Sequence, residues 1–173
     1  RKTVRQILNH HFDRFGKCDR IKTLASHLKM STLFFEKKDE EKTMIPERLA
    51  ALREKMRAYG VDAYLVPTAD YHESEYVGTY FKARTYITGF TGSAGTAVIT
   101  QDEACLWTDG RYFVQAAKEL AGTGVTLMKM GQEGVPTVEE YLAANTKEGM
   151  TIGFDGRVVN EMLGEALEKT LPE

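Results

Sequence analysis

Cysteine, proline and tryptophan are scarce in this chain of 173 residues, which contains two Cys, four Pro and one Trp. Two cysteines are too few for a disulfide scaffold and are typical of a reducing compartment, so we expect a cytoplasmic location. No run of roughly 18 or more apolar residues is present, which excludes a hydrophobic membrane-spanning helix. The net charge of −2 offers no reason to expect binding to nucleic acid.

Charge is unevenly distributed along the chain. Residues 1–43 carry 11 Lys and Arg against 6 Asp and Glu, a net charge of +5, whereas the remainder carries 12 against 19, a net charge of −7. The first segment lacks the features of a secretory signal, and Asp13 and Asp19 are unusual in a mitochondrial presequence. We therefore expect residues 1–43 to be an upstream extension, poorly ordered or partly helical, and residues 44–173 to form the folded domain.

Candidate metal ligands are few. The adjacent pair His10 and His11 cannot both bind one ion from a rigid helix, because neighbouring helical side chains point about 100° apart. After Met44 the sequence holds one histidine, His72, and no pair of ligands at metal-binding spacing. A catalytic metal site needs about three protein ligands or more, so we expect neither a metal ion nor a catalytic residue set in this chain.

Local patterns predict several helices and strands. Apolar residues recur every three or four positions from Ile45 to Tyr59, which predicts a helix that opens near Pro46 and ends at Gly60. The apolar run Asp62–Pro67 predicts a buried strand, whereas residues 69–92 are irregular. Later strands are expected at Thr96–Thr100, Ala104–Thr108, Val125–Met130 and Met150–Phe154. Later helices are expected at Gly110–Leu120, Val138–Ala144 and in the last segment, whose inward residues are Val159, Met162, Leu163, Ala166 and Leu167.

These elements together predict the fold class. The short link between the strands at 96–100 and 104–108 makes them an antiparallel hairpin. Strands that alternate with helices, combined with one hairpin, predict an α/β domain with a mixed β-sheet of about five to six strands flanked by helices. The sequence ends where a returning strand is expected, so we interpret the chain as a C-terminally truncated fragment.

The densest polar motif is TDGRYF, at the turn from a strand into a helix. Asp109 is a favourable N-cap, whereas Arg111 in the first turn opposes the helix dipole, so an anionic or carbonyl group is expected beside it. That group is either internal (Asp109, Asp70 or Glu75) or an oxygen of a bound ligand. Internal ion pairs are the commoner case, and the spacing leaves both possibilities open.

Two other motifs are expected to serve the structure. The glycines of GFTGSAG (89–95) match neither a dinucleotide-binding nor a Walker loop, and a strand follows them. They indicate a tight turn and close backbone packing. Asp70, His72, Ser74 and Glu75 lie too close in sequence for a catalytic triad and lack the glycines of a nucleophile elbow. We expect them to hydrogen-bond within an ordered loop.

The same motifs resemble a known family. ADYHESEY (69–76), ITGFTGSAGTAVIT (87–100), LWTDGRYFVQAAKEL (106–120) and TLMKMG (126–131) resemble the N-terminal domain of three-domain Xaa-Pro aminopeptidases (aminopeptidase P), in the creatinase/prolidase superfamily. IGFDGRVV (152–159) resembles the same family less closely. Their order and spacing cover nearly all of residues 44–173. The resemblance implies a creatinase/prolidase-type N-terminal domain, with a second domain and a catalytic domain beyond residue 173.

An activity also follows from the resemblance. It implies a metalloaminopeptidase, a hydrolase that removes the N-terminal residue from peptides with proline in second position. It also implies two divalent metal ions, typically manganese, bound outside this chain, and a homodimer that takes proline-containing peptides as its partners. Neither nucleic acid nor membrane is implied. The 173-residue chain by itself is then expected to be inactive.

Arg111 is the residue to which the resemblance assigns a function, the binding of the peptide at the mouth of the active site. Asp109 is expected to orient it, with Asp70, His72 and Glu75 as supporting residues. Because a fold does not settle function, a non-catalytic creatinase-like protein-binding domain is the first alternative. A stand-alone α/β ligand-binding module is the second.

Overall fold

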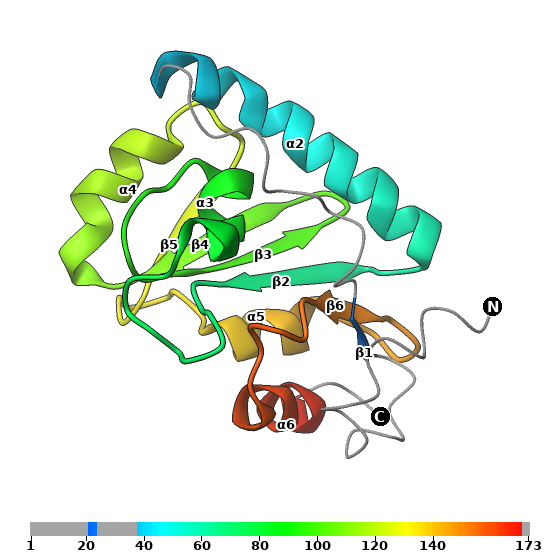
Figure 1. Cartoon of the computed structure of the whole chain (residues 1–173). Coiled ribbons are helices and arrows are strands. Elements are labelled where there is room, and N and C mark those ends of the chain that lie inside the picture. Colours follow the sequence, from blue (N-terminus) through cyan, green and yellow to red (C-terminus); the bar gives the residue numbers. More distant parts are fainter. Residues whose placement is uncertain (1–20, 24–37, 171–173) are drawn as a thin grey trace.

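The structure is a computed structural model that describes residues 21–23 and 38–170 (Figure 1). A six-stranded sheet lies at its centre, in the order β1-β6-β2-β3-β4-β5. The strands are β1 (Ile21–Thr23), β2 (Ala63–Pro67), β3 (Thr96–Thr100), β4 (Ala104–Thr108), β5 (Thr126–Lys129) and β6 (Ile152–Phe154). β3 is antiparallel to β2 and β4, and the other pairs are parallel. The expected mixed sheet and its hairpin are confirmed.

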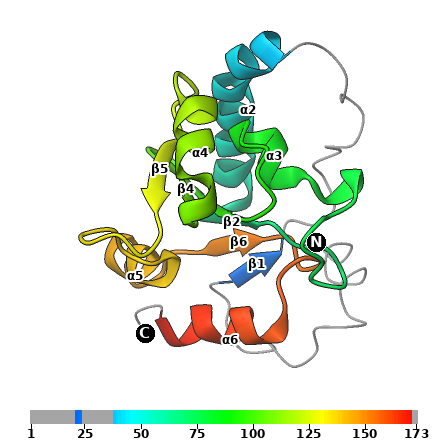
Figure 2. The ribbon, with the colours of Figure 1, turned by 90° about the vertical axis from the view of Figure 1, so that its left-hand side faces the viewer.

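The strand directions gather four loops at one edge of the sheet. β2, β4 and β6 run in the same direction and end at this edge, and the antiparallel β3 begins there. We call it the carboxyl edge. The segments that follow β2, precede β3 and follow β4 and β6 therefore lie along it, and Figure 2 turns it toward the viewer. These segments contain the ADYHESEY, GFTGSAG, TDGRY and DGRV motifs.

Helices cover both faces of the sheet (Figure 1). One face carries α2 (Lys38–Tyr59), α3 (Ala83–Thr88) and α4 (Phe113–Leu120), and the other carries α5 (Val138–Asn145) and α6 (Glu161–Thr170). Leu106 belongs to the first hydrophobic core and Trp107 to the second, because successive strand residues point to opposite faces. Within the described part of the chain, no helix has the length and apolarity needed to cross a membrane.

The apolar stripe of α2 packs on the sheet as its spacing predicts. Ile45, Leu49, Leu52 and Met56 are at most 3% exposed, whereas Tyr59 at the end of the helix is 39% exposed. The predicted start near Pro46 is wrong, because α2 begins at Lys38 and includes the proline. The Lys and Glu residues before it favour helix, and the fixed φ of proline is compatible with a helical backbone.

Three further expectations need correction. The helix expected over Gly110–Leu120 starts as a 3₁₀ helix, η2 (Gly110–Tyr112), before α4. The irregular region 69–92 contains α3 and the 3₁₀ helix η1 (Thr79–Phe81). Met162 was expected to face inward but is 74% exposed. The buried face of α6 contains Leu163 and Leu167, which lie one turn apart, and the side chain of Met162, next to Leu163 in sequence, points away from that face.

The division expected at Met44 falls inside α2. Upstream of it, Ile21–Thr23 pairs in parallel with β6 as the edge strand β1. The pair His10 and His11 lies outside the described residues. The domain boundary therefore stays a prediction.

Candidate functional site

The TDGRY turn begins directly after β4. Asp109 is the N-cap of η2, and its Oδ1 accepts a hydrogen bond from the backbone N–H of Arg111 at 3.0 Å. Its carbonyl oxygen accepts the N–H of Tyr112, also at 3.0 Å. One aspartate thus fixes the backbone of the whole turn, and its role as N-cap is confirmed.

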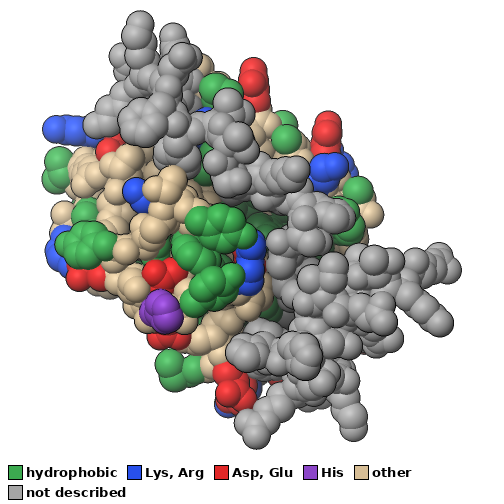
Figure 3. Space-filling model, viewed as in Figure 1, with side chains coloured by type: hydrophobic (Ala, Val, Ile, Leu, Met, Phe, Trp, Pro, Cys, Tyr) green, Lys and Arg blue, Asp and Glu red, His purple; other side chains and the backbone are tan. Residues whose placement is uncertain are grey.

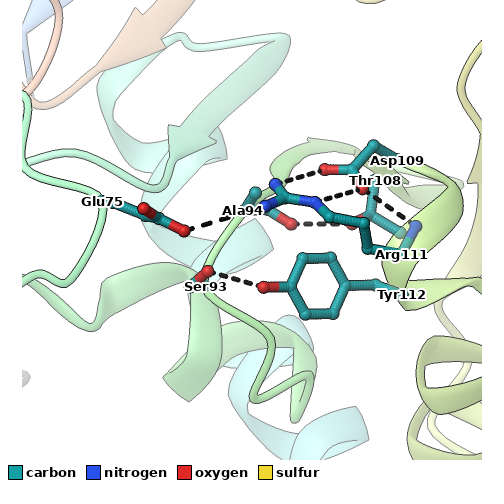
Figure 4. Close-up of polar contacts among 7 residues, drawn as sticks. All are labelled: Glu75, Ser93, Ala94, Thr108, Asp109, Arg111 and Tyr112. Carbon is teal, nitrogen blue, oxygen red and sulfur yellow. Dashed lines mark hydrogen bonds and ion pairs between the residues drawn. The ribbon is translucent and has the colours of Figure 1, made fainter.

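The side chain of Arg111 is held by the same aspartate (Figure 4). Its Nε lies 2.9 Å from Asp109 Oδ1 and its second terminal nitrogen 2.9 Å from Oδ2, a bidentate arrangement. The guanidinium lowers the pKa of the Asp109 carboxyl. Because the Arg111 side chain is 62% exposed, it is oriented but still accessible from solvent. A guanidinium presented in this way can bind a carbonyl or carboxylate oxygen.

Glu75 also approaches Arg111, whereas Asp70 does not. Glu75 Oε1 lies 3.8 Å from Arg111 Nη1, and both side chains are more than half exposed. Asp70 instead accepts hydrogen bonds from the backbone amides of Ser74 and His72, at 3.0 and 2.9 Å, which lower the pKa of its carboxyl. His72 itself is exposed and joins the cluster through its amide. Asp70 therefore shapes the loop that presents Glu75.

The GFTGSAG loop also hydrogen-bonds to the TDGRY turn (Figure 4). Ser93 Oγ lies 2.7 Å from the hydroxyl of Tyr112, and Thr108 Oγ1 donates to the carbonyl of Ala94 at 2.7 Å. A Cβ at Gly95 would lie 2.8 Å from the carbonyl oxygen of Trp107, so only glycine fits there. The predicted close backbone packing of this loop is confirmed.

Sequence reasoning missed Arg84, which fastens this loop. Its side chain is 3% exposed and donates to the carbonyls of Phe90, at 2.7 Å, and Gly92, and to Thr68 Oγ1 at 3.0 Å. Burial lowers the pKa of Arg84 to about 10, so the guanidinium stays protonated at neutral pH. The available signal was a basic residue five positions before the first glycine of the loop, but nothing in the sequence shows that its partners are backbone carbonyls.

The carboxylates of the site do not form a metal centre. Among residues 21–23 and 38–170, no cluster of three or more His, Cys, Asp or Glu side chains is arranged to hold a metal ion. Asp109 pairs with Arg111, and Asp70 accepts backbone amides. The arrangement therefore suits recognition of a polar ligand by a guanidinium.

Comparison with known families decides the relationship of this chain. The profile of the Creatinase/Prolidase N-terminal domain matches residues 48–173. The chain belongs to this family. The resemblance expected from its motifs and the α/β fold class are thus confirmed.

Individual relatives of this creatinase/prolidase domain are peptidases by name. "Aminopeptidase P2" of Arabidopsis thaliana is 41% identical over 137 residues, covering 78% of this chain and 19% of that protein. "Probable Xaa-Pro aminopeptidase P" of Talaromyces marneffei is 48% identical over 125 residues, covering 72% and 19%. An X-prolyl aminopeptidase structure from Caenorhabditis elegans, described as a cytosolic enzyme with a di-nuclear active site, matches with a TM-score of 0.63 and 33% identity, covering 78% and 22%. The chain spans about a fifth of the length of these relatives.

Proposed function

We propose that this chain is the N-terminal, peptide-binding part of an Xaa-Pro aminopeptidase, which removes the first residue from peptides with proline in second position. The observation that carries the proposal is the accessible guanidinium of Arg111, locked by two hydrogen bonds to Asp109. The names of relatives 41% and 48% identical to this chain favour an enzyme over the non-catalytic binding domain.

In this function, Arg111 donates to a carbonyl or carboxylate oxygen of the peptide, and Asp109 holds the guanidinium in the orientation that receives it. Glu75, 3.8 Å away, limits the other side of the guanidinium, and Asp70 and His72 keep the Glu75 loop in place. Because the guanidinium is oriented before the peptide arrives, less side-chain entropy is lost on binding.

The chemistry itself belongs to two divalent metal ions, proposed to be manganese and to be bound by residues outside this chain. Such ions activate a water molecule and stabilise charge on the scissile carbonyl. We further propose that the whole enzyme is cytosolic, as the Caenorhabditis elegans relative is described, and that it is a homodimer.

Substitution of Arg111 in the whole enzyme tests the proposal. Arg111→Ala should lower kcat/KM for a proline-second peptide roughly 10- to 100-fold, since a hydrogen bond to a charged group contributes about 1.5–3 kcal/mol. Arg57→Ala is the matched control, because Arg57 is an exposed arginine that bonds Gln101 at the opposite edge of the sheet. Unchanged steady-state kinetics of Arg111→Ala, with a folded protein, would contradict the assignment.

A further inference from the structure

A second Asp-Gly-Arg turn repeats the geometry of the first. Asp155 follows β6 as Asp109 follows β4, and its Oδ1 accepts the backbone N–H of Arg157 at 3.0 Å and Arg157 Nε at 2.9 Å. Its carbonyl oxygen accepts the N–H of Val158 at 3.0 Å. Each of these three bonds has a counterpart of the same length in the first turn. The molecule therefore presents two arginines, each locked by its own aspartate.

Both turns lie along the carboxyl edge, which Figure 2 faces. β4 and β6 are parallel to each other and separated in the sheet by β3 and β2. Three strand spacings of about 4.8 Å place the two turns roughly 14 Å apart. An extended peptide advances about 3.4 Å per residue, so about four to five residues span the distance.

The loop after β2 makes contacts near both turns. At one end Glu75 approaches Arg111, and at the other Glu73 accepts a hydrogen bond from Asn160, three residues beyond Arg157. Glu73 also carries the one positive φ, 56°, found among the described non-glycine residues. This loop therefore contacts Arg111 of the first Asp-Gly-Arg turn and the segment that follows the second.

Exposed aromatic rings accompany Arg157. Its guanidinium lies 5.2 Å from the centre of the Tyr80 ring and also donates to the Tyr80 hydroxyl. Tyr71 and Tyr80 each pack edge-on against Phe81, with ring centres 5.0 Å apart, and are 62% and 55% exposed. On the face that Figure 3 shows, which is the face seen in Figure 1, hydrophobic side chains lie beside basic and acidic ones. Aromatic surfaces of this kind bind proline-rich, extended peptides.

We propose that Arg157 and the Tyr80 ring form a second peptide-binding position, which contacts the substrate several residues from the part held by Arg111. The Arg157 side chain is 33% exposed, and after its bonds to Asp155 and Tyr80 it retains N–H groups for a peptide carbonyl or the terminal carboxylate. The inference rests on the proposed aminopeptidase function. It assigns a preference for substrates of about five residues or more.

Two variants, compared on a long and a short peptide, test this second position. In the whole enzyme, Arg157→Ala should lower kcat/KM for a heptapeptide with proline second roughly tenfold and change that for the matching tripeptide less than twofold. Tyr80→Leu, which leaves the Asp-Gly-Arg turn intact, should show the same dependence on length. Arg57→Ala should affect neither peptide. Equal losses for both peptides, or no loss for either, would overturn the inference.

Direct binding separates this inference from the proposed function. When the 173-residue chain is titrated with the heptapeptide, the backbone amide signals of Gly110 and Gly156 should both shift, whereas the tripeptide should shift Gly110 alone. If the whole enzyme hydrolyses neither peptide, the proposed function fails, and the Gly156 shift alone decides the second position. A Gly156 signal that the heptapeptide does not move overturns it.

Discussion

Asp109 orients the guanidinium of Arg111, and this guanidinium in turn lowers the pKa of the Asp109 carboxyl. The two side chains are two positions apart, so the sequence already places them as neighbours, and the N-cap role of the aspartate follows from its residue type. Whether the guanidinium would be buried or accessible was beyond the sequence. That depends on the loop that carries Glu75, which comes from another element.

The charge coupling predicts a change in titration. Arg111→Ala should raise the pKa of Asp109 toward its ordinary value, because the guanidinium is the main cause of its lowering. Since a lowered folded-state pKa contributes stability above the unfolded value, that contribution is lost as the pH falls through the lowered pKa. In the Arg111→Ala variant the folded-state and unfolded-state pKa values of Asp109 lie closer together, so this contribution to stability above the unfolded pKa is smaller.

Carboxyl NMR titration of both proteins measures this. Asp70 is the internal control, since its pKa is lowered by the backbone amides of Ser74 and His72 and should not move. An Asp109 pKa that is the same in both proteins would contradict the coupling.

The elements of this fold differ in how well local pattern predicts them. The hairpin and α5 were predicted within one residue, because the short link between the two strands and the capping box of Thr137 and Glu140 at the start of α5 are local signals. η1 and α3 were missed, since three and six residues are too few for periodicity to appear. The glycine-rich loop was interpreted correctly as closely packed, although its fastening by Arg84 is a contact across six to eight positions.

The loop predicts a contrast between two glycines. Gly92→Ala should destabilise the domain by about 1–3 kcal/mol, because its Cβ would lie 2.8 Å from Tyr112 Cδ1 and also against the Phe90 ring. Gly78→Ala should be neutral or slightly stabilising, since no atom lies within 4 Å of its Cβ and its φ is −61°. Urea unfolding of both variants measures the difference. Equal free energies of unfolding for the two variants would contradict the prediction that the loop around Gly92 is too closely packed for a Cβ.

At the scale of the whole molecule, the described residues contain no cluster of side chains arranged to hold a metal ion, and the proposed function assigns the two catalytic ions to residues outside this chain. We therefore predict that the purified 173-residue chain does not hydrolyse a proline-second peptide, even with added Mn²⁺. The X-prolyl aminopeptidase relative under the same conditions is the positive control. Turnover that purifies with the chain and is abolished by a chelator would refute the prediction.

The sequence by itself determined the class of the fold, the family and the N-cap role of Asp109, because hydrophobic periodicity, capping and motif spacing are properties of neighbouring residues. The tertiary structure decided which loops share an edge. Strand order and direction bring residues 75, 93, 111 and 157 to the carboxyl edge of the sheet. Pairings between distant strands follow from packing of the whole core, which no local pattern encodes.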